Sequence, residues 1–149
     1  MPTTISLTPH EHLTITASNH DLLGMDVTWT SAGHLPPPHF HPAQDERFEV
    51  LEGSLRTIVD GVERTLHAGE SLDVPRGAVH QMTALVDGTR AIWEVRPALR
   101  TEDFFRGMAA ANGNKLKQVD VAARHAKEFQ ATGALGALVR FVRIVRRGR

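Results

Sequence analysis

Hydrophobic and polar residues alternate along most of the first 100 residues of this chain. The alternation predicts two short N-terminal edge strands, near residues 5–7 and 13–15, and a third strand at 25–29. Further strands are predicted at 47–52, 55–59, 62–66, 71–74 and 90–96. Turn-forming residues separate them at intervals of about 8–12 residues, a spacing typical of an all-β sandwich or barrel. Among these turns, Asp60-Gly61 is a strong signal for a two-residue hairpin.

Side-chain direction follows from the same alternation. Successive residues of a strand point to opposite faces, so Glu46, Phe48 and Val50 share one face, and Met82 shares a face with His80. Before this region, prolines at 36–38 cannot donate to a sheet and fix the backbone, which predicts a stiff extended lead-in to His39. For Trp93, the pattern leaves open whether its face or that of Glu94 points inward.

After Pro97 the pattern becomes helical. Thr101 is predicted as the N-cap of a first helix, which ends at Asn112-Gly113. A second helix is predicted from Asp120 through Phe129, ending near Gly133.

Residues 134–149 form a basic amphipathic segment. Its apolar side holds Leu135, Leu138, Val139, Phe141, Val142 and Val145, and its other side holds Arg140, Arg143 and Arg147. Such a helix either lies on an anionic membrane surface or packs on its own protein. Packing is the expectation, because most amphipathic helices bury their apolar stripe within their own fold.

Composition narrows the class of protein. A chain of 149 residues is long enough for one domain with a core, and it has no cysteine, which excludes disulfides and thiolate ligands. The start of the chain lacks a secretory pattern and no stretch is apolar enough to span a membrane, so a cytoplasmic location is expected. A single short basic tail is weak evidence for nucleic-acid binding, so none is predicted.

Charge is distributed unevenly, although the net charge is zero. Residues 1–100 hold seven Arg and thirteen Asp or Glu, a net charge of −6, whereas residues 101–149 carry +6. The two segments therefore attract each other within a protomer or across a dimer.

Candidate chemistry is concentrated in histidines. His39 and His41 project to the same face of an extended strand, Glu46 follows five residues later, and His80 follows a Pro75-Arg76-Gly77 turn. Three imidazoles and a carboxylate suit a divalent transition metal such as Fe, Mn, Ni, Co or Zn.

The spacing around these residues matches two motifs, formed by Gly33, His39, His41, Glu46 and Gly53, and by Gly69, Pro75, Gly77 and His80. On these motifs the chain resembles the cupin superfamily, in particular small single-domain cupins with one conserved barrel, over roughly residues 24–97. The resemblance implies a mainly β jelly-roll barrel at residues 1–100 and leaves 101–149 as a C-terminal helical extension, which we expect to pack on the barrel. It further implies that His39, His41, Glu46 and His80 bind one metal. The family pattern often has Asn where this chain has Ala84, a position that is not a metal ligand.

The expected activity follows from this centre. Four protein ligands leave two positions of a six-coordinate ion open, and Phe48, Val50 and Met82 are candidates to line an apolar pocket beside it. We expect a metal-dependent small-molecule enzyme of the dioxygenase type, or a related tailoring enzyme, acting on a phenolic, diketone or similar substrate. The alternatives are a non-catalytic ligand-binding or metal-binding cupin, or a non-redox isomerase or cyclase. No catalytic residue is identified beyond the metal centre, and Glu49 and Glu94 are expected to be exposed strand carboxylates.

A homodimer is also expected. N-terminal edge strands, or a helical stripe of Phe104, Phe105 and Met108, would otherwise remain exposed.

Overall fold

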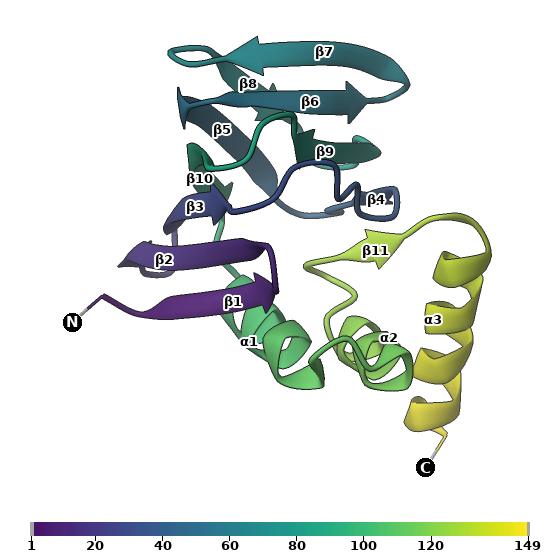
Figure 1. Ribbon diagram of the computed structural model, residues 1–149. Helices are drawn as coiled ribbons and strands as arrows, with labels where there is room; N and C mark the ends of the chain where they lie inside the picture. The colour runs from purple at the N-terminus through teal and green to yellow at the C-terminus, as the bar shows by residue number, and fades with distance from the viewer. Residues whose placement is uncertain (1, 149) are drawn as a thin grey trace.

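The predicted strands form two antiparallel sheets in a computed structural model that describes residues 2–148 (Figure 1). One sheet has six strands in the order β1-β2-β3-β10-β5-β8, and the other has five in the order β11-β4-β9-β6-β7. The strands are β1 (Thr4–Thr8), β2 (Glu11–Ser18), β3 (Leu23–Trp29), β4 (His39–Phe40), β5 (Asp45–Glu52), β6 (Ser54–Val59), β7 (Val62–His67), β8 (Ser71–Val74), β9 (His80–Ala84), β10 (Thr89–Arg96) and β11 (Gln130–Ala131). The helices are α1 (Thr101–Ala111), α2 (Lys115–Arg124) and α3 (Gly133–Arg147). This mainly β jelly roll with a helical C-terminal segment confirms the predicted fold class.

The hydrophobic core draws on both sheets. The six-stranded sheet contributes fully buried side chains such as Leu13, Val27 and Phe48, and the five-stranded sheet contributes Leu55 and Leu66. Burial of this apolar surface is the main force that closes the barrel.

Strand β5 shows how the alternation positions the site. Glu46, Phe48 and Val50 are buried, whereas Arg47 on the opposite face is exposed. The predicted shared face is confirmed. The face that contributes Phe48 and Val50 to the core also directs the Glu46 carboxylate inward.

The predicted hairpin is also present. Asp60 and Gly61 both have positive φ, at 48° and 80°, and they join β6 to β7 with Val59 opposite Val62. Positive φ at both central residues is the requirement of a type I′ turn. The prolines at 36–38 form no strand and precede β4, as expected.

Helix α1 differs from its prediction at its first residue. Thr101 is not the N-cap, because the cap position is Arg100, which makes no side-chain capping bond. The hydroxyl of Thr101 instead accepts a hydrogen bond from the buried Gln44 Nε2, 2.7 Å away. This contact ties the start of the helical segment to the loop before β5. The helix ends at Asn112 in the left-handed conformation, as predicted.

The second helix was predicted wrongly. It begins at Lys115, where the Asn114 side chain caps it by accepting from the Lys117 N–H at 3.0 Å, and it ends at Arg124. Phe129 therefore lies outside the helix, and the chain continues into β11, which pairs with β4. Pairing with a distant strand overrides the local helical pattern here.

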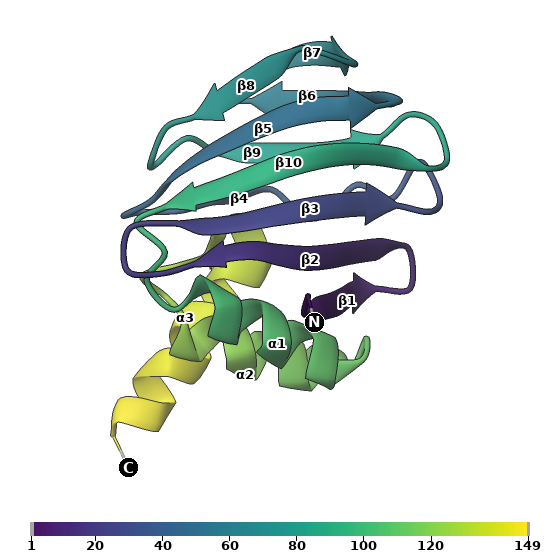
Figure 2. The ribbon, with the colours of Figure 1, turned by 90° about the vertical axis from the view of Figure 1, so that its left-hand side faces the viewer.

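Helix α3 forms where an amphipathic helix was expected, but its packing differs from the expectation. It packs on α2 and β11 (Figures 1 and 2), and it buries Gly136 and Val139. Leu138, Phe141 and Ile144 remain 47%, 63% and 67% exposed. Its one ion pair within residues 2–148 joins Arg146 to Asp120 of α2, so its arginines do not lie over barrel carboxylates.

Other parts of the helical segment contact the barrel directly. Helix α1 packs against β1, and β11 extends the five-stranded sheet at β4. None of the helices in residues 2–148 combines the length and the apolar character needed to cross a membrane.

Candidate metal centre

Three strands bring the predicted ligands together. His39 on β4 and His80 on β9 face each other in register, His41 follows the end of β4, and Glu46 lies near the start of β5. One ring nitrogen from each of His39, His41 and His80 lies within 4.8 Å of the others. Glu46 Oε1 lies 2.7 Å from His41 Nε2 and 2.9 Å from His80 Nε2. The four residues that the sequence singled out are thus neighbours in space.

The orientation of each imidazole is fixed by a backbone carbonyl. Nδ1 of His39 donates to Pro37 O at 2.9 Å, and Nδ1 of His80 donates to Ala78 O at 2.9 Å. Nδ1 of His41 donates to Glu128 O at 2.6 Å. Because a carbonyl oxygen only accepts, each Nδ1 carries the proton, and Nε2 of the neutral ring keeps a free lone pair. This is the arrangement that protein metal sites use to present histidine ligands.

A close contact between two acceptors indicates the kind of group that the site suits. His41 Nε2 and Glu46 Oε1 are both buried, and neither has a partner with hydrogen-bond geometry, although they lie 2.7 Å apart. Two lone pairs at this distance repel each other in a buried site unless a cation lies against them. The residues therefore fit a metal cation, and His39 Nε2 and His80 Nε2 would complete its donor set.

The electrostatics keep His39 and Glu46 in the protonation states that a metal requires. Burial, followed by the neighbouring His80 and His41, lowers the pKa of His39 to about 4. Burial alone would raise the pKa of Glu46, but His41 and His80 outweigh it and hold that pKa well below its usual range. Burial lowers the pKa of His41, yet the Glu46 carboxylate more than compensates, so this pKa is raised. An ionised carboxylate thus adjoins imidazoles, one of which is held neutral near pH 7.

Trp93 supports the carboxylate. Its Nε1 donates to Glu46 Oε2 at 2.5 Å, and its ring stacks on Phe48 with centroids 5.1 Å apart. The indole side of β10 therefore faces inward, which the alternation alone left open. A partly buried indole N–H needs an acceptor, and the nearby carboxylate was the signal available in the sequence.

The helical segment also reaches the centre. The ring of Phe129 stacks on His39 with centroids 4.9 Å apart, and on its other side it contacts Phe104, also at 4.9 Å. Its neighbour Glu128 supplies the carbonyl that holds His41. No motif marked these two residues, because the pattern around them favoured a helix.

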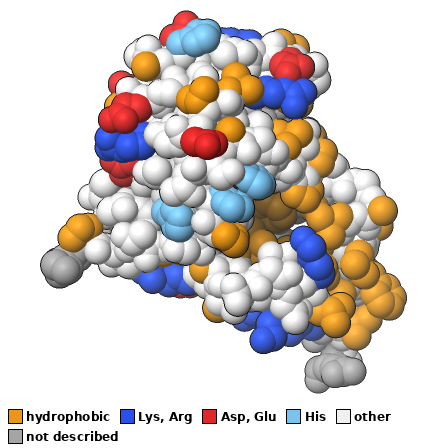
Figure 3. Space-filling view, in the orientation of Figure 1, with side chains coloured by type: hydrophobic (Ala, Val, Ile, Leu, Met, Phe, Trp, Pro, Cys, Tyr) orange, Lys and Arg blue, Asp and Glu red, His pale blue; other side chains and the backbone are white. Residues whose placement is uncertain are grey.

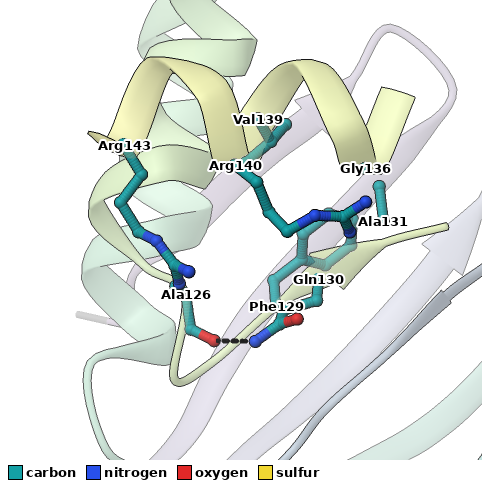
Figure 4. Close-up of a pocket in the computed structure, with 8 residues that line it drawn as sticks. All are labelled: Ala126, Phe129, Gln130, Ala131, Gly136, Val139, Arg140 and Arg143. Atoms are coloured by element: carbon teal, nitrogen blue, oxygen red, sulfur yellow. Dashed lines mark hydrogen bonds between the residues drawn. The ribbon is translucent and has the colours of Figure 1, made fainter. Parts of the chain in front are cut away.

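The predicted pocket residues lie in the core. Phe48, Val50 and Met82 are all buried. The cavity drawn in Figure 4 lies between α3 and β11 and has other walls, including Phe129, Val139, Arg140 and Arg143. A second cavity lies near Ser18 and Arg100. The role of Phe48, Val50 and Met82 as substrate contacts thus stays a prediction.

Figure 3 shows a hollow between the barrel and the helical segment. Hydrophobic side chains line it, histidine side chains lie on the barrel side, and a basic side chain lies on the helical side.

The Cupin domain family model matches residues 28–94, the segment that contains all four candidate ligands. Residues 28–94 thus form a cupin domain. Two curated relatives are germin-like proteins. Germin-like protein subfamily T member 2 of Arabidopsis thaliana is 36% identical over 84 residues, which cover 53% of this chain and 38% of the relative. Germin-like protein 9-1 of Oryza sativa subsp. japonica is 34% identical over 83 residues, covering 46% and 34%. The chain therefore matches well under half the length of either relative.

Solved structures share the barrel. An RmlC-like cupin from Shewanella frigidimarina NCIMB 400 has a TM-score of 0.60 and 24% identity, covering 68% of this chain and 89% of that one. KdgF from Halomonas sp. has a TM-score of 0.59 and 23% identity, covering 64% and 86%. Pac13, described as a nucleoside dehydratase, has a TM-score of 0.57 and 14% identity, covering 68% and 81%. These similarities concern the fold.

Proposed function

We propose that this cupin is a metal-dependent enzyme that acts on a small organic molecule, of the dioxygenase type or a related tailoring type. The observation that carries the proposal is the contact between His41 Nε2 and Glu46 Oε1, two buried acceptors 2.7 Å apart. A metal cation against both atoms makes that contact favourable, and two further imidazoles adjoin it.

The donor set selects the kind of ion. Three imidazole nitrogens and one carboxylate oxygen suit Fe, Mn, Ni, Co or Zn, and the absence of cysteine excludes a thiolate site. Such an ion supplies Lewis-acid chemistry to a substrate oxygen and, if it is iron or manganese, redox chemistry. His39, His41, Glu46 and His80 would hold it.

The surrounding side chains of this chain hold the donors in place and exclude water. Trp93 fixes one oxygen of Glu46, and Phe129 covers one face of the His39 ring. These aromatic side chains, together with Phe48, make the surroundings apolar. An apolar, aromatic environment suits a planar organic molecule better than a sugar or a free amino acid.

The second candidate is a cupin that binds a ligand or metal without turnover. It is favoured by the position of Glu94, which is paired with Arg96 at 3.2 Å and lies away from the centre. A reaction that needs a separate general acid or base would therefore have to take it from the ligand set or from the substrate.

The proposal is tested on protein loaded separately with iron, manganese, nickel, cobalt or zinc. Oxygen uptake and substrate loss are measured across a panel of phenolic and diketone compounds. Turnover that requires iron or manganese supports the dioxygenase type. Turnover with zinc and no oxygen uptake points to an isomerase or cyclase, and saturable binding with no product favours the second candidate.

A further inference from the structure

The outward face of α3 is apolar and has no partner within residues 2–148. Leu138, Phe141 and Val145 recur at helical spacing, with Ile144 beside them, and all four are exposed. The opposite side, at Gly136 and Val139, is the one that packs on the rest of the protein. The exposed face is therefore an apolar surface that the packing of α3 on the rest of the protein does not cover.

All the charged side chains of α3 are also of one sign. Residues 133–147 contain four arginines and no acidic residue. Arg146 is paired with Asp120, whereas Arg140, Arg143 and Arg147 form no ion pair with any residue from 2 to 148. Arg140 and Arg147 lie four and three residues from Ile144, so on the helix surface they border one edge of the apolar face.

The barrel does not provide the missing counter-charges. Five of its arginines are already paired with barrel carboxylates: Arg47 with Asp73, Arg56 with Glu63, Arg76 with Asp45, Arg90 with Asp26 and Glu52, and Arg96 with Glu94. These acids are thus largely neutralised within their own sheet. A second copy of α3 placed against the same face would bring arginines towards arginines, which is unfavourable.

We infer that α3 binds an anionic lipid surface. The apolar side chains of Leu138, Phe141, Ile144 and Val145 enter the boundary between headgroups and acyl chains, and the arginines contact lipid phosphates. A helix of this length lies in the plane of the surface and does not cross it. Figures 1 and 2 show α3 at the periphery, with its C-terminal end directed away from the barrel. The barrel can therefore remain outside the lipid.

The test is cosedimentation of the full chain with vesicles of phosphatidylcholine alone and of phosphatidylcholine containing phosphatidylglycerol. Wild-type protein is expected to pellet with the anionic vesicles at least about 10-fold more strongly than with neutral vesicles, and salt should weaken the binding. The double variant Phe141→Asp, Ile144→Asp should lose the binding. The matched control is Val62→Asp, which changes a side chain that is 64% exposed on β7 and should bind as wild type does.

A variant that removes positive charge separates the electrostatic contribution to lipid binding from the apolar one. Arg140→Gln with Arg147→Gln should weaken binding to anionic vesicles, while Arg64→Gln in the barrel should not. Thermal melts and metal content should be unchanged in all of these variants, because the side chains are exposed.

Three results would overturn the inference. The first is no binding of wild-type protein to anionic vesicles, and the second is equal binding to neutral ones. The third is a wild-type dimer that the Phe141→Asp, Ile144→Asp variant converts to a monomer, since a second copy would then cover this face.

Discussion

Nδ1 of His41 donates a hydrogen bond to the backbone carbonyl of Glu128, 2.6 Å away and 87 positions later in the chain. The ligand is thus oriented by a segment outside the matched barrel region, which ends at residue 94. Phe129, the next residue, stacks on His39. The candidate metal centre and the helical segment are therefore one structural unit.

Replacing Phe129 with Ala should weaken metal binding and lower stability. The substitution removes a half-buried ring that holds His39 in place, so we expect a loss of about 1–3 kcal/mol in the free energy of unfolding. We further expect about a 10–100-fold loss in metal affinity, the typical effect of losing a group that supports a ligand. Denaturant melts of metal-free protein and calorimetric metal titration measure the two effects. Phe141→Ala, at a side chain that is 63% exposed, is the control and should change neither. Equal metal affinity in the two variants would show that Phe129 does not position the site.

Replacing Trp93 with Phe should weaken metal binding while the barrel stays folded. Phenylalanine keeps the stack on Phe48 but removes the N–H that Glu46 accepts, and losing a hydrogen bond to a buried charge costs about 1–3 kcal/mol. A carboxylate without that donor is also more basic, so metal binding should require a higher pH than in wild type. Metal titration at several pH values checks this. Trp29→Phe serves as the control, and a Trp93→Phe profile that overlays it would contradict the role of the indole.

Metal affinity should fall as the pH is lowered. A protonated imidazole cannot bind metal, and the pKa of His41 is raised above its usual value by Glu46, so protons compete at this ligand already at a pH above about 6.5. His39, with a pKa of about 4, adds a second proton only in more acidic solution. Below the pKa of His41, one displaced proton implies a loss of at least about ten-fold per pH unit. An affinity that stays constant from pH 8 to 5, measured by calorimetry, would argue against histidine ligation.

A homodimer remains our expectation, on narrower grounds than the sequence suggested. Phe104 and Phe105 are buried within the chain, so they no longer require a partner. Strand β1 is still the outer strand of its sheet and presents unpaired backbone groups. Light scattering should give a dimer, and Ser6→Pro on β1 should shift it towards monomer. A monomer of the wild-type protein at high micromolar concentration would refute the expectation.

Local patterns predicted the barrel well because its strands obey them. On β5 the alternation around Phe48 correctly separates buried from exposed positions, and at Asp60-Gly61 the turn chemistry correctly predicts the hairpin. The motif spacing likewise selected His39, His41, Glu46 and His80, which the fold brings together. These are cases in which neighbouring residues determine the outcome.

The parts that sequence did not predict depend on distant contacts. Residues 125–131 read as helix or helix end, but pairing of β11 with β4 and the stack of Phe129 on His39 determine their path. The inward direction of Trp93 depends on its contact with Glu46 across the sheet. The amphipathic pattern of α3 correctly predicted a helix, but it could not indicate which part of the apolar surface the rest of the chain would cover.

The metal content of purified wild-type and His41→Ala protein tests the proposed centre most directly. Elemental analysis of the wild type should find one transition metal per chain. His41→Ala should retain only a small fraction of it, because the variant leaves the buried Glu46 oxygen without its nearest imidazole. His67→Ala, an exposed histidine on β7, should keep the full content. Full metal content in His41→Ala, or none in the wild type after loading with any of the five candidate metals, would contradict the assignment of this site.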